Sequence, residues 1–247
     1  NSDAIRSSFA GYVWTHLRMS SDTDYSDRAD GSEAIPIALD RILDRIMADN
    51  PITTVRQGLF HFEIRTYPEI ALREAILNAL VHADYRIPGP ILVKQFRDKL
   101  EISNPGDLPG GITPENILRH EPVPRNPALV DALTRLRLVN RSNLGVRRMY
   151  QALLIEGKEP PAILDEGQAV RVVFRASDLS APFRMFVAEE GDRGRILTVE
   201  YLLVIEHLLR HPEIDTATAT RITQQNEQDA RETLSRMETK LGYLERG

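Results

Sequence analysis

The sequence contains no cysteine, which excludes disulfide bonds and metal sites built from thiolates. It also has no apolar run close to the roughly 20 residues that a membrane-spanning helix needs. The first residues, NSDAIRSSFAGYVW, lack the pattern of a signal peptide. These absences predict a protein of the cytoplasm with no membrane partner.

Acidic residues outnumber basic ones, and the formal net charge of the 247 residues is -5. This balance argues against a protein that coats nucleic acid, although it allows a local basic face. Such a face is predicted between Arg125 and Arg148, where six arginines accompany one acid, Asp131. A phosphate of a nucleotide or of DNA would fit there, beside the start of a predicted helix. The alternative is that Arg135 and Arg137 are merely solvated.

One apolar stretch, REAILNALVHADYR at residues 73–86, carries Glu74, Asn78 and His82 at four-residue spacing. On a helix these three side chains fall within a narrow arc. Nearly all other positions are apolar, which predicts a buried helix. Buried polar groups need partners, so the stripe either joins a polar network in the core or lines a pocket.

The N-terminal patterns alternate between strands and helices. A strand is predicted over residues 11–19. A solvated linker is predicted over residues 20–31, SSDTDYSDRADG. A helix over 35–50 and a strand over 59–67 follow. The helix that carries the polar stripe then starts near Pro68.

A hairpin comes next, because ILVKQF and LEIS flank a turn at residues 97–99. Thr113 is expected to cap a helix, and two more helices are expected over 126–138 and from a cap at Ser142 or Asn143. AVRVVFRAS closes the region as a strand. Residues 31–177 therefore predict an α+β domain with helices over a sheet.

From residue 183 the patterns are almost purely helical. Three helices and a turn into a strand at residues 242–244 give the order of a winged helix-turn-helix. The third helix presents polar side chains of the types that read base edges: Gln225, Asn226, Gln228, Arg231, Ser235 and Arg236. Residues 183–247 hold nine basic and twelve acidic residues, however, which weakens phosphate attraction. A dimerisation or protein-contact module is the alternative.

The ordered segments ALREAILNALVHADYR, LEISNPGDLPGGITPENI, RNPALVDALTRL and SNLGVRRM resemble the GHKL-type (Bergerat-fold) ATPase domain. More specifically, they resemble its RecG-like C-terminal subgroup. Proteins of this subgroup combine a Schlafen/AlbA-type DNA-binding domain, this ATPase-type domain and a winged helix, and are regarded as transcription regulators. The resemblance implies an AlbA-type end and linker over 1–30, a GHKL-like helix-over-sheet sandwich over 31–177 and a winged helix over 183–247. It also implies that the chain is a fragment and that DNA is a partner of the full-length protein.

The resemblance also implies roles for individual residues. Glu74 would be the general base and Asn78 the Mg²⁺ ligand. Asn104 and Gly106 would form the adenine-recognising turn, in which an amide replaces the usual carboxylate. The remaining nucleotide-binding residues would be His82, Asp84, Ser142, Asn143, Gly145 and Arg147.

The phosphate lid departs from the GHKL pattern, since it has one glycine and Leu144 stands where backbone should approach phosphate. This favours a degenerate domain that senses a nucleotide or serves as a scaffold. A slow Mg²⁺-dependent ATPase is the alternative, and a purely structural homodimerisation unit is a third reading. The sequence has no G-x-x-x-x-G-K-[ST] loop, because Glu159 follows Gly157-Lys158, so no helicase motor is expected.

Overall fold

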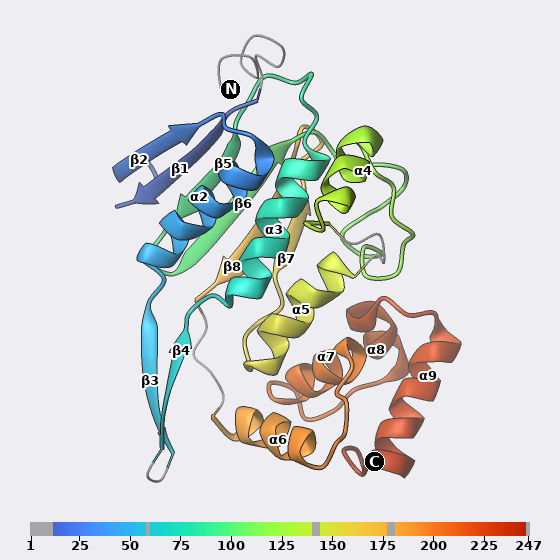
Figure 1. Cartoon of the computed structure of the whole chain (residues 1–247). Coiled ribbons are helices and arrows are strands. Elements are labelled where there is room, and N and C mark those ends of the chain that lie inside the picture. The colour runs from blue at the N-terminus through green and yellow to red at the C-terminus, as the bar shows by residue number, and fades with distance from the viewer. Residues whose placement is uncertain (1–11, 58–59, 140–143, 177–180, 246–247) are drawn as a thin grey trace.

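The centre of the structure is a mixed six-stranded sheet in the order β2-β1-β5-β6-β8-β7 (Figure 1). The computed structural model describes residues 12–57, 60–139, 144–176 and 181–245. Strands β1 and β5 are parallel, and the other neighbouring pairs are antiparallel. The strands are β1 (Trp14–Met19), β2 (Tyr25–Gly31), β5 (Ile91–Gln95), β6 (Lys99–Pro105), β7 (Ala162–Asp165) and β8 (Ala169–Arg175).

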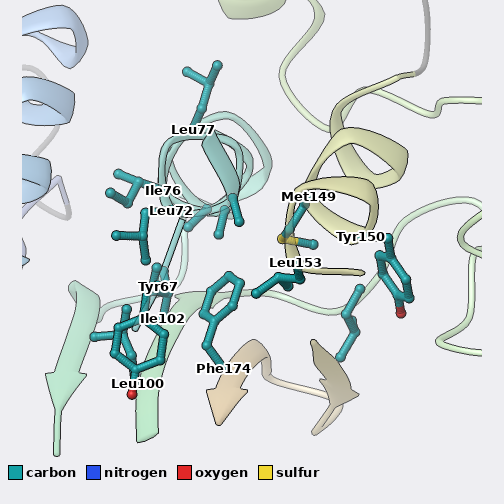
Figure 2. Packing of buried hydrophobic residues seen from close by; sticks show 14 of the residues in the cluster. Tyr67, Leu72, Ile76, Leu77, Leu100, Ile102, Met149, Tyr150, Leu153 and Phe174 are labelled. Atoms are coloured by element: carbon teal, nitrogen blue, oxygen red, sulfur yellow. The ribbon is translucent and has the colours of Figure 1, made fainter. Parts of the chain in front are cut away.

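Three helices cover one face of this sheet: α2 (Ile35–Ala48), α3 (Glu69–His82) and α5 (Gly145–Ile155) (Figure 1). Side chains of α3 and α5 pack over Leu100, Ile102 and Phe174 of the strands (Figure 2). Burial alternates along β5, as expected of a sheet with one face toward the core. The predicted α+β class, with helices over a sheet, is confirmed.

Residues 25–31 form β2, so the predicted linker over 20–31 is wrong. Strand β1 pairs with β2 on one side and with β5 on the other, which makes both strands part of the main sheet. The sequence did not reveal β2 because it is a mostly exposed edge strand with few apolar residues. Polar contacts hold it instead, among them the Thr15 hydroxyl donating to Asp30 at 2.7 Å.

The helix expected from Thr113 is replaced by turns over 114–119. The Thr113 N–H donates to the side-chain oxygen of Asn116 at 2.8 Å, and the Asn116 amide donates to the Gly111 carbonyl at 3.0 Å. Such local side-chain bonds compete with the helical ladder. The predicted hairpin β5–β6 and the helix α4 (Pro127–Arg135) are present, and β3 (Ile52–Gln57) pairs with β4 (Phe60–Arg65) in a separate ribbon.

A helical tail follows the sheet: α6 (Ala181–Asp192), α7 (Val199–Leu208), α8 (Thr216–Thr223) and α9 (Glu227–Arg236). A π-helical turn, Met237–Leu241, extends α9, and the described residues up to 245 contain no strand where the wing was expected. Helix α7 contributes Leu202 and Leu203 to the main apolar cluster. None of the described helices is both long and apolar enough to cross a membrane.

A substitution at Gly31 tests the placement of β2. A Cβ at this position would overlap the indole ring of Trp14, which is fully buried. Gly31→Ala should therefore lower the free energy of unfolding by about 1–3 kcal/mol in denaturant titrations. Gly191→Ala on α6 is the control, because a Cβ there meets nothing within 4 Å, and its stability should be unchanged or slightly higher. Equal stability of the two variants would contradict the pairing of β2.

Candidate functional site

A cavity of about 850 Å³ lies between α3, α4, α5, the strands β6–β8 and residues 107–124, which we call the wall loop. Glu74, Asn78 and His82 all line it. The polar stripe of α3 therefore borders an open space, while the apolar residues of the helix, except Ile70 in its first turn, are buried. Of the two interpretations of the stripe, the pocket wall fits the structure.

Glu74 lies at the junction of α3 and α5. Its carboxylate is 3.9 Å from the Arg73 guanidinium and 3.8 Å from that of Arg148. A Cβ added to Gly145 would lie 3.0 Å from Glu74 Oε2 and 3.7 Å from Asn78 Oδ1. The side chain of Leu144, the residue before α5, does not cap this helix, and the positive start of α5 lies beside these two oxygens.

His82 is the last residue of α3, and its Nδ1 is buried without a hydrogen-bond partner among the described residues. Burial lowers the pKa of His82, and the nearby Arg125 charge lowers it further. The imidazole is therefore neutral near pH 7. It can offer one acceptor or donor, but no positive charge, to a ligand.

Among the residues that the structure describes, three arginines line the cavity: Arg73, Arg137 and Arg148. The sequence analysis included Arg148 in a basic face suited to phosphate but not among the nucleotide-binding residues, and it did not include Arg73 in either. Helical periodicity could have identified Arg148, because Gly145, Arg148 and Met149 share one face of α5 and all line the cavity. The arginines near Glu74 give that end of the cavity its positive charge.

Arg147 does not line the cavity. It donates to Glu200 of α7 at 2.9 Å, so its predicted contact with a nucleotide is not what the structure shows. The physical reason is the rotation of α5, which turns Arg147 toward the tail and Arg148 toward the cavity.

Asp84 also lies outside the cavity lining. Arg86 donates to its carboxylate at 2.7 and 2.9 Å, and Arg125 lies 3.5 Å away. The hydrogen bonds from Arg86 hold the pKa of Asp84 well below its usual range. Gly106, with φ of +99°, packs against Asp84 and is likewise absent from the lining, so both residues serve the scaffold and the cavity gives their predicted nucleotide contacts no support.

Asn104 does line the cavity, and it is 7% exposed. Its amide nitrogen donates to the Pro105 carbonyl at 3.1 Å. Much of the remaining lining is apolar, including Leu77, Ile117, Val130, Leu138, Met149 and Val170. An apolar cavity with a few charged groups suits a ligand with a ring and an anionic end. Ser142 and Asn143 lie outside the described residues.

No group of three or more His, Asp or Glu side chains suited to a metal ion exists in the described part of the chain. Asn78 and Glu74 offer two oxygen donors near the start of α5. Mg²⁺ commonly uses one or two protein oxygens together with water and substrate phosphates. These residues therefore fit Mg²⁺ only as a companion of a phosphate-bearing ligand.

The predicted DNA-reading residues of α9 are largely engaged within the tail. Gln225 bonds the hydroxyl groups of Thr223 and Thr233, and Asn226 caps α9 at 2.8 Å from the Asp229 N–H. The two arginines pair with glutamates one turn earlier, Arg231 with Glu227 and Arg236 with Glu232. Gln228 and Ser235 are exposed. Gln225 and Asn226 thus shape the turn between α8 and α9.

Comparisons with known proteins agree with this arrangement. Residues 89–174 match a family described as "Putative ATP-dependent DNA helicase recG C-terminal". The matched residues run from β5 to β8 and include Asn104 and α5. The match begins after α3, so it does not include Glu74, Asn78 or His82.

A solved structure resembles nearly the whole chain. It is the crystal structure of the DIP2311 protein from Corynebacterium diphtheriae, at a TM-score of 0.80 and 26% identity. The similarity covers 94% of this chain and 48% of that one, so the chain spans about half the length of the solved protein. No curated protein matches the chain.

The depressed pKa of His82 makes stability depend on pH. The unfolded histidine binds a proton near pH 6.5, and the folded one binds a proton only at lower pH. The stability that neutral His82 contributes is therefore complete above about pH 6.5. This contribution is lost as the pH falls toward the folded pKa. His82→Gln should reduce the slope of the free energy of unfolding against pH by up to about 1.4 kcal/mol per pH unit. Denaturant titrations between pH 8 and 5 measure it. Identical slopes for wild type and variant would show that His82 is not held neutral. His16 also has a lowered pKa, but it is present in both proteins and so does not affect the comparison.

Proposed function

We propose that the cavity binds a nucleoside triphosphate together with Mg²⁺, and that the chain senses this ligand rather than turning it over rapidly. The observation that carries the proposal is the meeting of Glu74 and Asn78 with the start of α5 inside the cavity. Helix starts favour anions, because their N–H groups lack partners and the dipole is positive there. The ATPase-type family match over 89–174 supports the same ligand class.

The cavity arginines suit the phosphate chain. A charge-assisted hydrogen bond is about 2.7–2.9 Å long, whereas Arg73 and Arg148 stand at 3.9 and 3.8 Å from Glu74. These long pairs leave guanidinium donors for a phosphate, and the Arg148 side chain is 47% exposed. Phosphates carried by Mg²⁺ on Asn78 would lie beside them.

The base would occupy the apolar part of the cavity, with Asn104 at its wall. An amide can accept from an amino group, as the carboxylate of GHKL ATPases does, but without charge assistance. We therefore expect weaker base recognition than in those enzymes.

Slow Mg²⁺-dependent hydrolysis is the second candidate, favoured by the place of Glu74 in the cavity lining. A general base must reach the attacking water directly or through one other water. Against fast turnover stands Leu144, which is 40% exposed just before α5 where a glycine would let backbone approach phosphate. We propose binding as the main function for this reason.

The proposal extends to transcription regulation in a longer protein, where the resemblance supports DNA contact by a Schlafen/AlbA-type domain. The helices α7–α9 follow the order of a helix-turn-helix. Pairing of Arg231 and Arg236 with glutamates leaves α9 poorly suited to DNA phosphates, so we assign the DNA contact to no residue of α9.

Nucleotide binding is tested by calorimetric titration with Mg²⁺ and a non-hydrolysable ATP analogue. Asn78→Ala removes the proposed metal oxygen and Arg148→Ala a phosphate contact, and each should weaken binding about 10–100-fold, given about 1.5–3 kcal/mol for a charged hydrogen bond. Arg135→Ala on α4 is the control, because Arg135 is exposed and does not line the cavity. No binding by wild type, or equal losses in all three variants, would overturn the proposal.

Hydrolysis is tested by phosphate release from Mg²⁺–ATP. Glu74→Gln keeps the shape of the side chain and removes the base, so any activity that uses Glu74 should fall at least about 100-fold. The affinity for the non-hydrolysable analogue should change far less. Release that continues at the wild-type rate in Glu74→Gln would exclude Glu74 as the base.

A further inference from the structure

The helical tail holds the wall loop of the cavity from outside. Gln224, between α8 and α9, uses both ends of its side-chain amide on this loop. Its oxygen accepts from the Leu118 N–H at 2.8 Å, and its nitrogen donates to the Pro114 carbonyl at 2.9 Å. Ile117, beside this contact, lines the cavity.

The backbone of Gln224 supports the importance of this contact. Its φ is +56°, a left-handed conformation that residues other than glycine rarely adopt. Surrounding contacts must compensate for that conformation. The two hydrogen bonds to the wall loop provide such contacts.

Glu200 of α7 makes a second connection, and it joins two walls of the cavity. Its Oε1 accepts from Arg119 of the wall loop at 2.6 Å and from Arg147 of α5 at 2.9 Å. Burial alone would raise the pKa of Glu200, but hydrogen bonds from its own backbone and from Arg147 hold it below its usual value. The carboxylate is therefore charged and binds both arginines.

The helices α8 and α9 are less firmly attached than α7. Their buried residues Ala219 and Ala230 lie outside the main apolar cluster, which contains Leu202 and Leu203 of α7. A second cavity of about 210 Å³ lies between α5 and this region and is lined in part by Tyr150, Ile222 and Gln224. Polar contacts, rather than dense apolar packing, thus connect α8–α9 to the wall loop.

We propose that the occupant of the large cavity and the docking of α8–α9 are coupled through Gln224 and Glu200. A ligand that contacts the wall loop biases the position of Pro114, Leu118 and Arg119. It thereby changes the contacts between this loop and the turn between α8 and α9. Coupling of this kind is reciprocal, so loss of the contacts between the wall loop and the tail must also change ligand affinity. The tail is then the part of the chain that reports occupancy. The ligand is taken from the proposed function, but the mechanical connection does not depend on it.

The first test needs no ligand and uses amide hydrogen exchange. Gln224→Ala should speed exchange of the Leu118 amide severalfold, because its acceptor is lost. Ile117→Ala, on the cavity side of the wall loop, should speed exchange across α8–α9. Leu108→Ala is the control for the second variant, since Leu108 lines the cavity but its N–H bonds Asp165, away from the tail. Unchanged exchange in α8–α9 of Ile117→Ala would overturn the coupling.

The second test adds Mg²⁺ and the non-hydrolysable ATP analogue. The analogue should change amide exchange in α8–α9 of wild type and should leave it unchanged in Gln224→Ala. The affinity of Gln224→Ala for the analogue should differ from that of wild type at least about fivefold. Gln228→Ala, an exposed glutamine on α9, should behave as wild type. Equal affinity and equal exchange in wild type and Gln224→Ala would overturn the proposal. If wild type does not bind the analogue, the proposed function fails, and the ligand-free arm alone decides the coupling.

Discussion

The structure depends on one constraint: α3 is a buried helix that carries Glu74, Asn78 and His82 in a line. A buried polar group without a partner costs about 1–3 kcal/mol, so a sealed core would have to supply a hydrogen bond to each of them. The fold instead opens a cavity along the stripe and brings the start of α5 and two guanidinium groups to Glu74. The same arrangement that accommodates the stripe creates a place for an anion.

The arginines divide between scaffold and cavity according to geometry. Arg119 and Arg147 converge on Glu200, and Arg125 binds Asp84 and Asp107, so these three connect elements of the fold. Arg73, Arg137 and Arg148 face the cavity. One step along α5, from residue 147 to 148, rotates a side chain by about 100° and separates a structural arginine from a candidate ligand contact.

Apolar patterning predicted α2, α3 and α5, and together with the turn at residues 97–99 it predicted the hairpin β5–β6. It could not predict β2, an exposed edge strand, or the turns over 114–119, where the side chain of Asn116 bonds the backbone of Gly111 and Thr113. The resemblance assigned Asp84 to the nucleotide site together with His82. Helix α3 ends at His82, however, and the chain then turns away toward Arg86. Positions beyond a helix end cannot be inferred from helical spacing.

The motif residues that most strongly suggested a nucleotide site include several that build the scaffold. Asn126 donates to the carbonyls of Val81 and Ala83 at 2.8 and 2.9 Å and so fixes the end of α3. Gly106 lets the turn after β6 approach Asp84 closely. These contacts determine where His82 and the cavity wall lie. The match of residues 89–174 to an ATPase-type family therefore describes the frame of a cavity, and the nature of its ligand depends on the few side chains that line it.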